Sequence, residues 1–249
     1  MSRVPAAVPA PVPEPESGVP GVAVIMPVLD EAPALAARLP ALLDYGFDEI
    51  IVVDGGSRDG GPAIVAELAG RSGGRLTLVT APAGRALQMN AGAARARAAL
   101  LLFLHTDTVL RADAAGRIRT ALAAGHDWGR FDVRLDGRRW AYRVIERLMN
   151  LRSRLSGIAT GDQAIFVRRV LFQELGGYAP IPLMEDIDLS RRLKRHGRPA
   201  CIRSPVLTSA RRWERGGVAR TVLLMWRLRL LYWLGAAPER LARRYRVVR

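Results

Sequence analysis

The sequence predicts an α/β fold in which a mostly parallel central sheet is flanked by helices and followed by a C-terminal helical tail. Over the first hundred residues, short apolar runs rich in β-branched residues alternate with helix-forming stretches. The runs are apolar on both faces, which is typical of parallel strands covered by helices. The chain has 249 residues, 49% of them hydrophobic, which is enough for a substantial core.

The first half of the chain is expected to alternate strictly between strand and helix. Residues 1–20 hold six prolines, so we expect a disordered leader there, with order beginning at Gly21. Apolar runs give the strands, the GGSRDGG turn ends the second strand, and the alanine-rich segment favours a helix. The predicted elements are strand 21–29, helix 30–44, strand 48–54, helix 62–70, strand 75–80, helix 85–99 and strand 100–105.

The second half is less regular. Its predicted elements are helix 111–124, strand 128–135 with one solvated face, helix 138–154, strand 162–169, helix 184–197 and an amphipathic helix over 218–234. The segment 184–197 begins with acidic residues and ends with basic ones, the favourable order for a helix dipole, and Gly197 would end it. We expect one domain over 21–213, with halves 21–108 and 109–213, and a basic tail over 214–249.

The charge and the cysteine content narrow the classes of protein. The formal net charge is +15, and residues 211–249 hold 11 arginines against two glutamates, which suggests anionic partners. The single cysteine, Cys201, excludes an internal disulfide framework and indicates a reducing compartment, the cytoplasm. We identify neither a membrane-spanning run nor a signal peptide. Aromatic residues are only 6%, so we expect no nucleic acid partner.

Carboxylates follow three of the predicted strands. The sequence lacks the G-x-x-x-x-G-K-[ST] motif of P-loop proteins, a G-x-G-x-x-G after the first strand, and the G-x-S-x-G of serine hydrolases. Instead, Asp30 and Glu31, Asp54, and Asp107 stand at the carboxyl ends of the first, second and fourth strands. Ligands of open α/β sheets bind at that edge, where a carboxylate can hold a base N–H, a ribose hydroxyl or a divalent cation.

Five motifs in order resemble those of the family 2 glycosyltransferases. They are IMPVLDEA (25–32), VVDGGSRDGG (52–61), GRALQMNAGAARA (84–96), LFLHTDT (102–108) and MEDIDLSRRL (184–193). The resemblance covers about residues 21–213 and implies the GT-A fold, a single α/β domain that binds a nucleotide-sugar. GDQAIF (161–166) and the tail ending LGAAPERLARRY are similar to a small branch labelled arsenosugar-biosynthesis-type glycosyltransferases.

The resemblance assigns the first two loops to the nucleotide. Pro27 and Glu31 would shape the loop under the base and ribose. Asp54 would accept a hydrogen bond from the uracil ring N–H, with Gly56 in the turn that follows. The alternative for Asp54 is that it caps that turn, although Ser57 also stands there for that purpose.

Two further segments are assigned to the donor. Arg85 opens a helix whose N-terminus could meet phosphate, and Gln88 lies one turn later, where an ordinary polar helix residue is the alternative. His105, Thr106 and Asp107 stand where the family has its D-x-D motif. The resemblance implies that Asp107 binds Mn²⁺ or Mg²⁺ at the diphosphate. His105 departs from the pattern and would hydrogen-bond the ribose or join the metal, tilting the site towards Mn²⁺.

The catalytic pair implied by the resemblance is Glu185 and Asp186. Asp186 is our choice of general base for the acceptor hydroxyl, with Glu185 second; the alternative is that both decorate a helix N-terminus. Gly161, Asp162 and Gln163 fall where the family contacts the donor sugar or acceptor, although Asp162 could also cap a turn.

The tail admits several interpretations. Arg212 and Trp213, in a sequence that faintly resembles the Q-x-x-R-W motif, could close over the diphosphate. The apolar face of 218–234, with the basic residues up to 249, could pack on the domain, form a homodimer, or contact the inner face of an anionic membrane.

The sequence thus predicts a metal-dependent inverting glycosyltransferase. It would move a sugar from a nucleoside-diphosphate donor, UDP-linked by our choice, to a small or lipid-linked acceptor. The alternatives are an inactive GT-A-like scaffold, a sugar nucleotidyltransferase and, least favoured, a basic nucleic-acid-binding protein.

Overall fold

A computed structural model describes residues 19–246, apart from the side chains of Arg212, Arg215 and Arg246. The predicted leader therefore lies outside the described residues, except for its last two. In the first half the elements are β1 (Val22–Val28), α1 (Ala32–Leu43), β2 (Glu49–Asp54), α2 (Gly61–Arg71), β3 (Leu76–Thr80), α3 (Arg85–Arg95), β4 (Leu100–Phe103), β5 (Thr108–Val109) and α4 (Ala114–Ala123). In the second half they are β6 (Trp128–Leu135), α5 (Trp140–Ser156), the 3₁₀ turn η1 (Gly161–Gln163), β7 (Phe166–Arg168), α6 (Arg169–Glu174), α7 (Glu185–Leu193), β8 (Ala200–Thr208), α8 (Arg211–Gly216), α9 (Val218–Trp233) and α10 (Pro238–Arg246).

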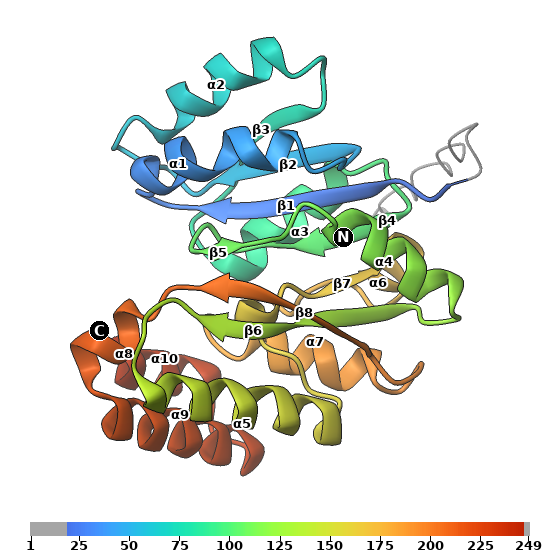
Figure 1. Ribbon diagram of the computed structural model, residues 1–249. Helices are drawn as coiled ribbons and strands as arrows, with labels where there is room; N and C mark the ends of the chain where they lie inside the picture. Colours follow the sequence, from blue (N-terminus) through green and yellow to red (C-terminus); the bar gives the residue numbers. More distant parts are fainter. Residues whose placement is uncertain (1–18, 247–249) are drawn as a thin grey trace, which may run out of the picture.

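One eight-stranded sheet runs through the molecule in the order β3-β2-β1-β4-β7-β6-β8-β5. The pairs β3–β2, β2–β1, β1–β4 and β6–β8 are parallel, whereas β7 is antiparallel to both its neighbours and β5 is antiparallel to β8. The arrowheads of β1, β6 and β8 point to the same side of the molecule (Figure 1). The mostly parallel α/β sheet is therefore confirmed, and the carboxyl ends of both halves share one edge.

Strand alternation divides the core into two layers. In β1, Val22, Val24, Met26 and Val28 belong to a cluster with α1, α2 and α4, whereas Ala23 and Ile25 belong to a cluster with α3, α6 and α7. Because successive side chains point to opposite faces, a strand apolar throughout can fill both layers. The prediction from residues apolar on both faces is thus correct for the first strands.

Several predicted element ends were wrong: α7 ends at Leu193 rather than at Gly197, and local hydrogen bonds explain two other cases. Helix α3 stops at Arg95 rather than residue 99, because the backbone N–H groups of Arg97 and Ala98 donate to the Glu49 carboxylate and draw the chain into β4. The strand predicted at 162–169 begins only at Phe166. Its first residues form η1, in which Gln163 completes a capping box with the residue before the turn.

The prediction for 128–135 also needs correction. The strand forms, but Arg130, on the face expected to be solvated, is fully buried and pairs with Asp132, which also pairs with Arg154 of α5. Strand β6 lies between β7 and β8 in the sheet. Helix α5 packs on β6 and covers a face that the polar residues suggested was open. Pairing with an acid is what makes a buried arginine tolerable.

The C-terminal helices pack on the second half of the sheet (Figure 1). Val218 and Trp213 contact a cluster formed by Leu135, Tyr142 and Ile145, and α9 and α10 form a further cluster with the segment before α7. Packing on the domain, one interpretation of the tail, is therefore observed. Within residues 19–246, no helix has both the length and the hydropathy needed to cross a bilayer.

The lack of space for a side chain at Gly129, in β6, gives a stability prediction. A Cβ on Gly129 would lie 2.5 Å from the Ala200 carbonyl oxygen and 2.4 Å from the Phe166 ring, whereas Gly116 in α4 has open space around it. We expect Gly129→Ala to lower the free energy of unfolding by about 1–3 kcal/mol. Gly116→Ala should raise it by about 0.5–1 kcal/mol. Urea unfolding of the two variants measures both, and equal stability would contradict the tight packing of β6 on β8.

Candidate active site

Side-chain carboxylates join the loops after β1 and β2. Asp59 accepts from the backbone N–H of Ala32 at 2.6 Å and from that of Gly61 at 3.0 Å, and these bonds lower its pKa. Asp30 accepts from the Arg58 N–H at 2.8 Å, and its own N–H donates to Ser57 Oγ. Asp30 has a left-handed φ of 53°, so this cross-link holds an uncommon backbone shape. The first loop is thus fixed to the second.

Gln88 is enclosed at the same edge. Its Nε2 donates to the carbonyl oxygens of Val28 and Val53 at 2.7 and 2.8 Å, and its Oε1 accepts from the Gly84 N–H. The side chain is buried, so its amide serves the fold instead of facing a ligand. This geometry matches the alternative of a structural helix residue, and we correct its assignment from nucleotide contact to loop positioning.

Asp54 ends β2 and is also buried. Its carboxylate accepts from the N–H groups of Gly56 and Ser57 at 3.0–3.2 Å, which is the turn-capping geometry. A carboxylate offers about four acceptor directions, so a cap does not use all of them. Pro27 pairs with Val53 one residue before the end of β1 and fixes the start of the loop. None of these residues lines the two cavities described next.

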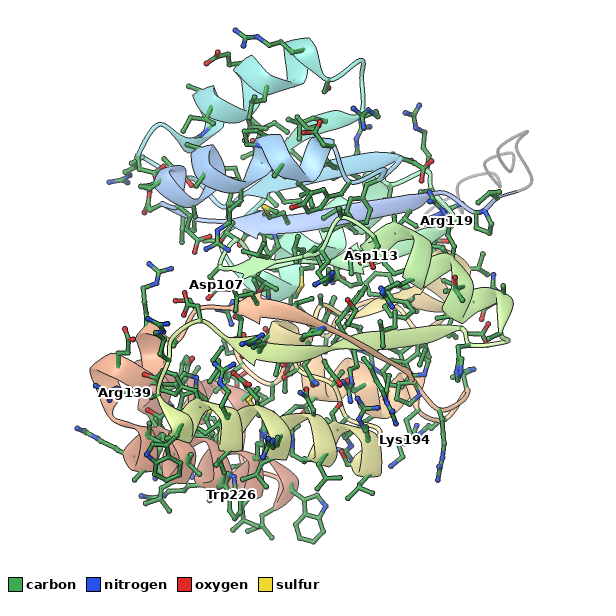
Figure 2. The ribbon with its side chains drawn as sticks, viewed as in Figure 1. Asp107, Asp113, Arg119, Arg139, Lys194 and Trp226 are labelled. Atoms are coloured by element: carbon green, nitrogen blue, oxygen red, sulfur yellow. The ribbon has the colours of Figure 1, made fainter. Side chains whose placement is uncertain are left out.

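A cavity of about 280 Å³ lies at the carboxyl edge of the sheet. Four residues predicted for the site line it: Glu31, Asp107, Asp162 and Trp213. Asp107 lies on the side to which the strands of both halves point (Figure 2). A smaller cavity of about 70 Å³ is lined by Arg85, Glu185 and Asp186, and it shares Met225 and Tyr245 with the larger one. The structure therefore brings seven of the predicted site residues to two adjoining cavities, whereas Pro27, Asp54 and Gln88 line neither of them.

The first loop reaches the D-x-D-like segment directly. The buried hydroxyl of Thr106 donates to the Glu31 carboxylate in a short hydrogen bond. Thr108 Oγ1 donates to Asp107 Oδ1 at 3.3 Å. Thr106 is therefore committed to orienting Glu31, while Asp107 borders the cavity.

His105 and the η1 turn pack closely. A Cβ on Gly161 would lie 2.5 Å from the imidazole Cε1, so only glycine leaves room for the ring. His105 Nδ1 lies 3.9 Å from Asp162 Oδ1. Burial lowers the pKa of His105, the nearby Arg85 charge lowers it further, and Asp162 opposes this only in part. A neutral imidazole has one ring nitrogen free of a proton, as metal ligation requires. Gln163 is fully buried, with its Oε1 accepting from the Thr160 N–H.

Glu185 and Asp186 open α7 but have different environments. Asp186 Oδ2 accepts from the Gly161 N–H at 2.9 Å and its Oδ1 from the Ile187 N–H at 2.7 Å. Glu185 is only 6% exposed. Burial raises its pKa to about 7, helped by the negative charge of Asp186 and opposed by Arg85. The helix-end alternative thus holds in part for Asp186, which also faces a cavity.

Arginines surround this acidic pair. Removal from water disfavours the charged form of Arg85, but the negative charges of Glu185, Asp162 and Asp186 outweigh this effect and raise its pKa. Arg229 of α9 lines the smaller cavity, and burial lowers its pKa. Burial and the charge of Arg229 lower the pKa of Arg152 to about 10. The sequence motifs did not point to Arg152 or Arg229, because both lie on helices that were interpreted only by their amphipathic pattern.

The tail supplies residues that motif reasoning missed. Arg211, Thr221, Leu224, Met225 and Tyr245 line the larger cavity, so α8, α9 and α10 form one of its walls. The apolar periodicity of 218–234 indicated a buried face, but not that the face borders this cavity. The predicted diphosphate residue Arg212 belongs to α8, and its side chain lies outside the described residues.

The metal-binding capacity of the site is limited. In the described part of the chain, no three His, Cys, Asp or Glu side chains are grouped so as to hold a metal ion by themselves. Asp107 and His105 together offer at most two protein ligands. That number fits a cation of the Mg²⁺ class, which is commonly held by one or two carboxylates together with substrate phosphates and water.

The fold is shared with solved glycosyltransferases. TarS residues 1–349 from S. aureus superposes with a TM-score of 0.61 at 16% identity, covering 77% of this chain and 61% of that one. The mannosyltransferase PcManGT from Pyrobaculum calidifontis, in complex with GDP-Man and Mn²⁺, gives 0.60 at 20% identity, covering 89% and 64%. TarS 1–349 in complex with UDP gives 0.60 at 17% identity, covering 76% and 60%. The chain thus spans less than two thirds of each structure.

These superpositions show the fold alone, and they confirm the predicted GT-A architecture. No curated protein is a significant match to the chain. The sequence model described as glycosyl transferase family 2 matches residues 23–175, which is more than half of the 249 residues and includes the segments that carry Glu31, Asp107 and Asp162. The chain therefore belongs to glycosyl transferase family 2.

Proposed function

We propose that this chain transfers a sugar from a nucleoside diphosphate, UDP by our choice, to an acceptor hydroxyl with inversion, with the help of a divalent cation. One observation carries the proposal: Glu31, Asp107 and Asp162 line a cavity that adjoins the cavity of Glu185 and Asp186. This arrangement supports a donor-binding side and a base that face each other across one reaction point. That TarS has been solved with UDP and PcManGT with GDP-Man and Mn²⁺ is consistent with this.

The donor is held by residues at three strand ends. Asp54 accepts the ring N–H of the base through acceptor directions that the Gly56–Ser57 turn leaves unused. Glu31, fixed by Thr106, accepts from the ribose. Arg85 neutralises diphosphate charge together with the N-terminus of α3.

Asp107, with His105 beside it, holds Mn²⁺ or Mg²⁺ at the diphosphate. When bound, the cation stabilises the negative charge that builds on the leaving diphosphate. The chain's own contribution is to keep His105 unprotonated by burial and to hold the imidazole against Gly161. Trp213 borders the larger cavity on the side of the tail, and the diphosphate contact of Arg212 stays a prediction from the sequence.

In the transfer step, the acceptor hydroxyl oxygen bonds to the anomeric carbon as the bond from that carbon to the diphosphate oxygen breaks. The diphosphate leaves with the electron pair, and the acceptor proton passes to Asp186. The Gly161 and Ile187 N–H groups hold the Asp186 carboxylate towards the η1 turn. Asp162 and Gly161 border the position of the transferred sugar. Glu185, with its raised pKa, is the second candidate for the base.

The donor prediction concerns Asp107. A nucleotide at about 100 times its dissociation constant stabilises the folded state by about 2.7 kcal/mol, which corresponds to a rise of about 5–10 °C in Tm. We expect UDP with Mn²⁺ to raise the Tm of the wild type in this way. EDTA or Asp107→Asn should remove the rise. Asp44→Asn, the same change on an exposed residue, is the control, and an undiminished shift for Asp107→Asn would exclude its metal role.

The base prediction concerns Asp186. We expect Asp186→Asn to lower kcat by about 10²- to 10⁴-fold, because the acceptor proton then has no carboxylate to receive it. UDP release from a panel of UDP-sugars measures turnover, and the UDP–Mn²⁺ Tm shift checks that the donor still binds. Glu185→Gln is the matched variant. If Asp186→Asn keeps its turnover and Glu185→Gln does not, the base is Glu185.

A third prediction follows from the pKa of Glu185. The pKa of Glu185 is about 7 in the folded state, against an ordinary value of 4.5. Well below pH 4.5 this carboxyl is protonated in both the folded and the unfolded state. Above that pH its ionisation disfavours the folded state. Glu185→Gln cannot ionise. It should therefore be more stable than the wild type by about 1–3 kcal/mol at pH 8, and this gain should vanish towards pH 4.

Urea unfolding at the two pH values measures that difference. Glu174→Gln, an exposed position in α6, shows how much comes from removing one negative charge anywhere in the chain. A stability difference for Glu185→Gln that is the same at pH 4 and pH 8 would contradict a buried carboxyl that ionises near neutrality.

A further inference from the structure

Helix α5 presents a row of large apolar side chains to solvent. Its exposed members, with their exposed fractions, are Trp140 (79%), Val144 (43%), Leu148 (56%), Leu151 (51%) and Leu155 (78%). The spacing of three and four residues places them along one side of the helix. The opposite side of α5 packs on β6, so the outward row is not needed for the core.

Helix α9 has a similar row. Its exposed members are Leu223 (68%), Trp226 (68%), Leu230 (56%) and Trp233 (76%), again three or four residues apart. Monomeric soluble proteins rarely expose contiguous apolar patches of this kind unless they contact a partner or a membrane.

The two rows lie next to each other. Val218, at the start of α9, packs against Tyr142 and Ile145 near the start of α5, and further along Arg229 and Arg152 interact electrostatically. The helices therefore run side by side in the same direction, and both lie at the outer edge of the molecule, where Trp226 is found (Figures 1 and 2). We call the nine exposed residues of the two rows the α5–α9 surface.

The charge of the α5–α9 surface selects its partner. Helix α5 carries four arginines and one acid, Glu146, which is buried, and α9 carries three arginines and no acid. Arg147, Arg220 and Arg227 are exposed beside the apolar rows. A second copy of the chain would meet these arginines with its own, and neither helix offers an exposed acid to pair with them. An anionic partner is complementary, so a homodimer through this surface is disfavoured.

Tryptophan at the ends of apolar rows, flanked by arginine, is the composition of helices that lie in a membrane interface. The indole ring prefers the boundary between acyl chains and water, and arginine places its stem in the apolar layer with its charge among headgroups. Each arginine near an anionic bilayer strengthens binding by about five-fold.

We propose that the α5–α9 surface docks on an anionic lipid bilayer and that the sugar acceptor is carried by that bilayer. The inference about the acceptor rests on the proposed glycosyl transfer, whereas the inference about bilayer docking does not. Helix α9 connects the two, because its other side supplies Leu224, Met225 and Arg229 to the catalytic cavities. With side chains, a helix is about 10–12 Å across. An acceptor headgroup at the bilayer surface therefore needs to rise only that far to reach Asp186.

The test uses the full chain and vesicles of phosphatidylcholine, with or without 30% phosphatidylglycerol. We expect the wild type to sediment with the anionic vesicles at least ten-fold more strongly than with the neutral ones, and 0.5 M NaCl to weaken this. Leu148→Ser combined with Trp226→Ser should abolish sedimentation. Val170→Ser, at another exposed apolar position, in α6, should leave it unchanged.

The UDP–Mn²⁺ shift in Tm separates this proposal from the proposed function. The double variant should keep the shift, because both substituted side chains point away from the cavities. Equal sedimentation of the double variant and the wild type would overturn the docking proposal, as would wild type that stays in the supernatant. A concentration-dependent dimer that the double variant abolishes, without vesicle binding, would likewise overturn it and identify a self-interface. Vesicle binding without any nucleotide shift would leave docking intact and refute the donor proposal.

Discussion

The amide of Gln88 is the interaction on which the carboxyl edge of the sheet depends. It donates to the carbonyl oxygens of Val28, the last residue of β1, and of Val53 in β2, and it accepts from the residue that precedes α3, so one side chain joins three segments that meet at the site. The Val28 carbonyl also accepts from the Gly55 N–H, which ties the loop after β2 to the end of β1. A buried polar group left without a partner costs about 1–3 kcal/mol, so the buried amide of Gln88 requires these carbonyl groups. Asp59 and Asp30 extend the same cross-linking to the loop surface.

The chemistry of the site results from crowding charges of both signs beside this fixed edge. The negative charges of Asp162, Glu185 and Asp186 raise the pKa of Arg85, and the charge of Arg85 opposes the rise in the pKa of Glu185. The two adjacent acids of α7 differ in their surroundings: Asp186 accepts from the Gly161 and Ile187 N–H groups, whereas Glu185 is buried and its pKa is raised to about 7. A carboxyl with a pKa near 7 exchanges its proton around neutral pH, which suits it to acid or base chemistry.

Much of the fold could be predicted from the sequence, because the first strands are buried on both faces and read as continuous apolar runs. Strand β8 could not, since Arg203, Ser204 and Pro205 interrupt it, and proline normally argues against a strand. The pairing of β6 with β8 is irregular at just this point, which is how the proline is accommodated. Similarly, motif positions located the Gln88 segment, but whether its amide faces a ligand or two carbonyl groups depends on contacts across 35 and 60 residues.

Helix α9 has one further consequence. It forms a wall of the larger cavity on one side and carries the exposed tryptophans on the other, and only Gly217 separates it from α8. Successive residues are about 100° apart around a helix, so adding two residues in that joint would turn α9 by about 200°. Such an insertion would point Trp226 at the cavity and Met225 at solvent, although no residue of α9 itself would change. The length of the joint therefore fixes the rotation of α9 about its axis. Point substitutions can preserve that rotation, whereas short insertions cannot.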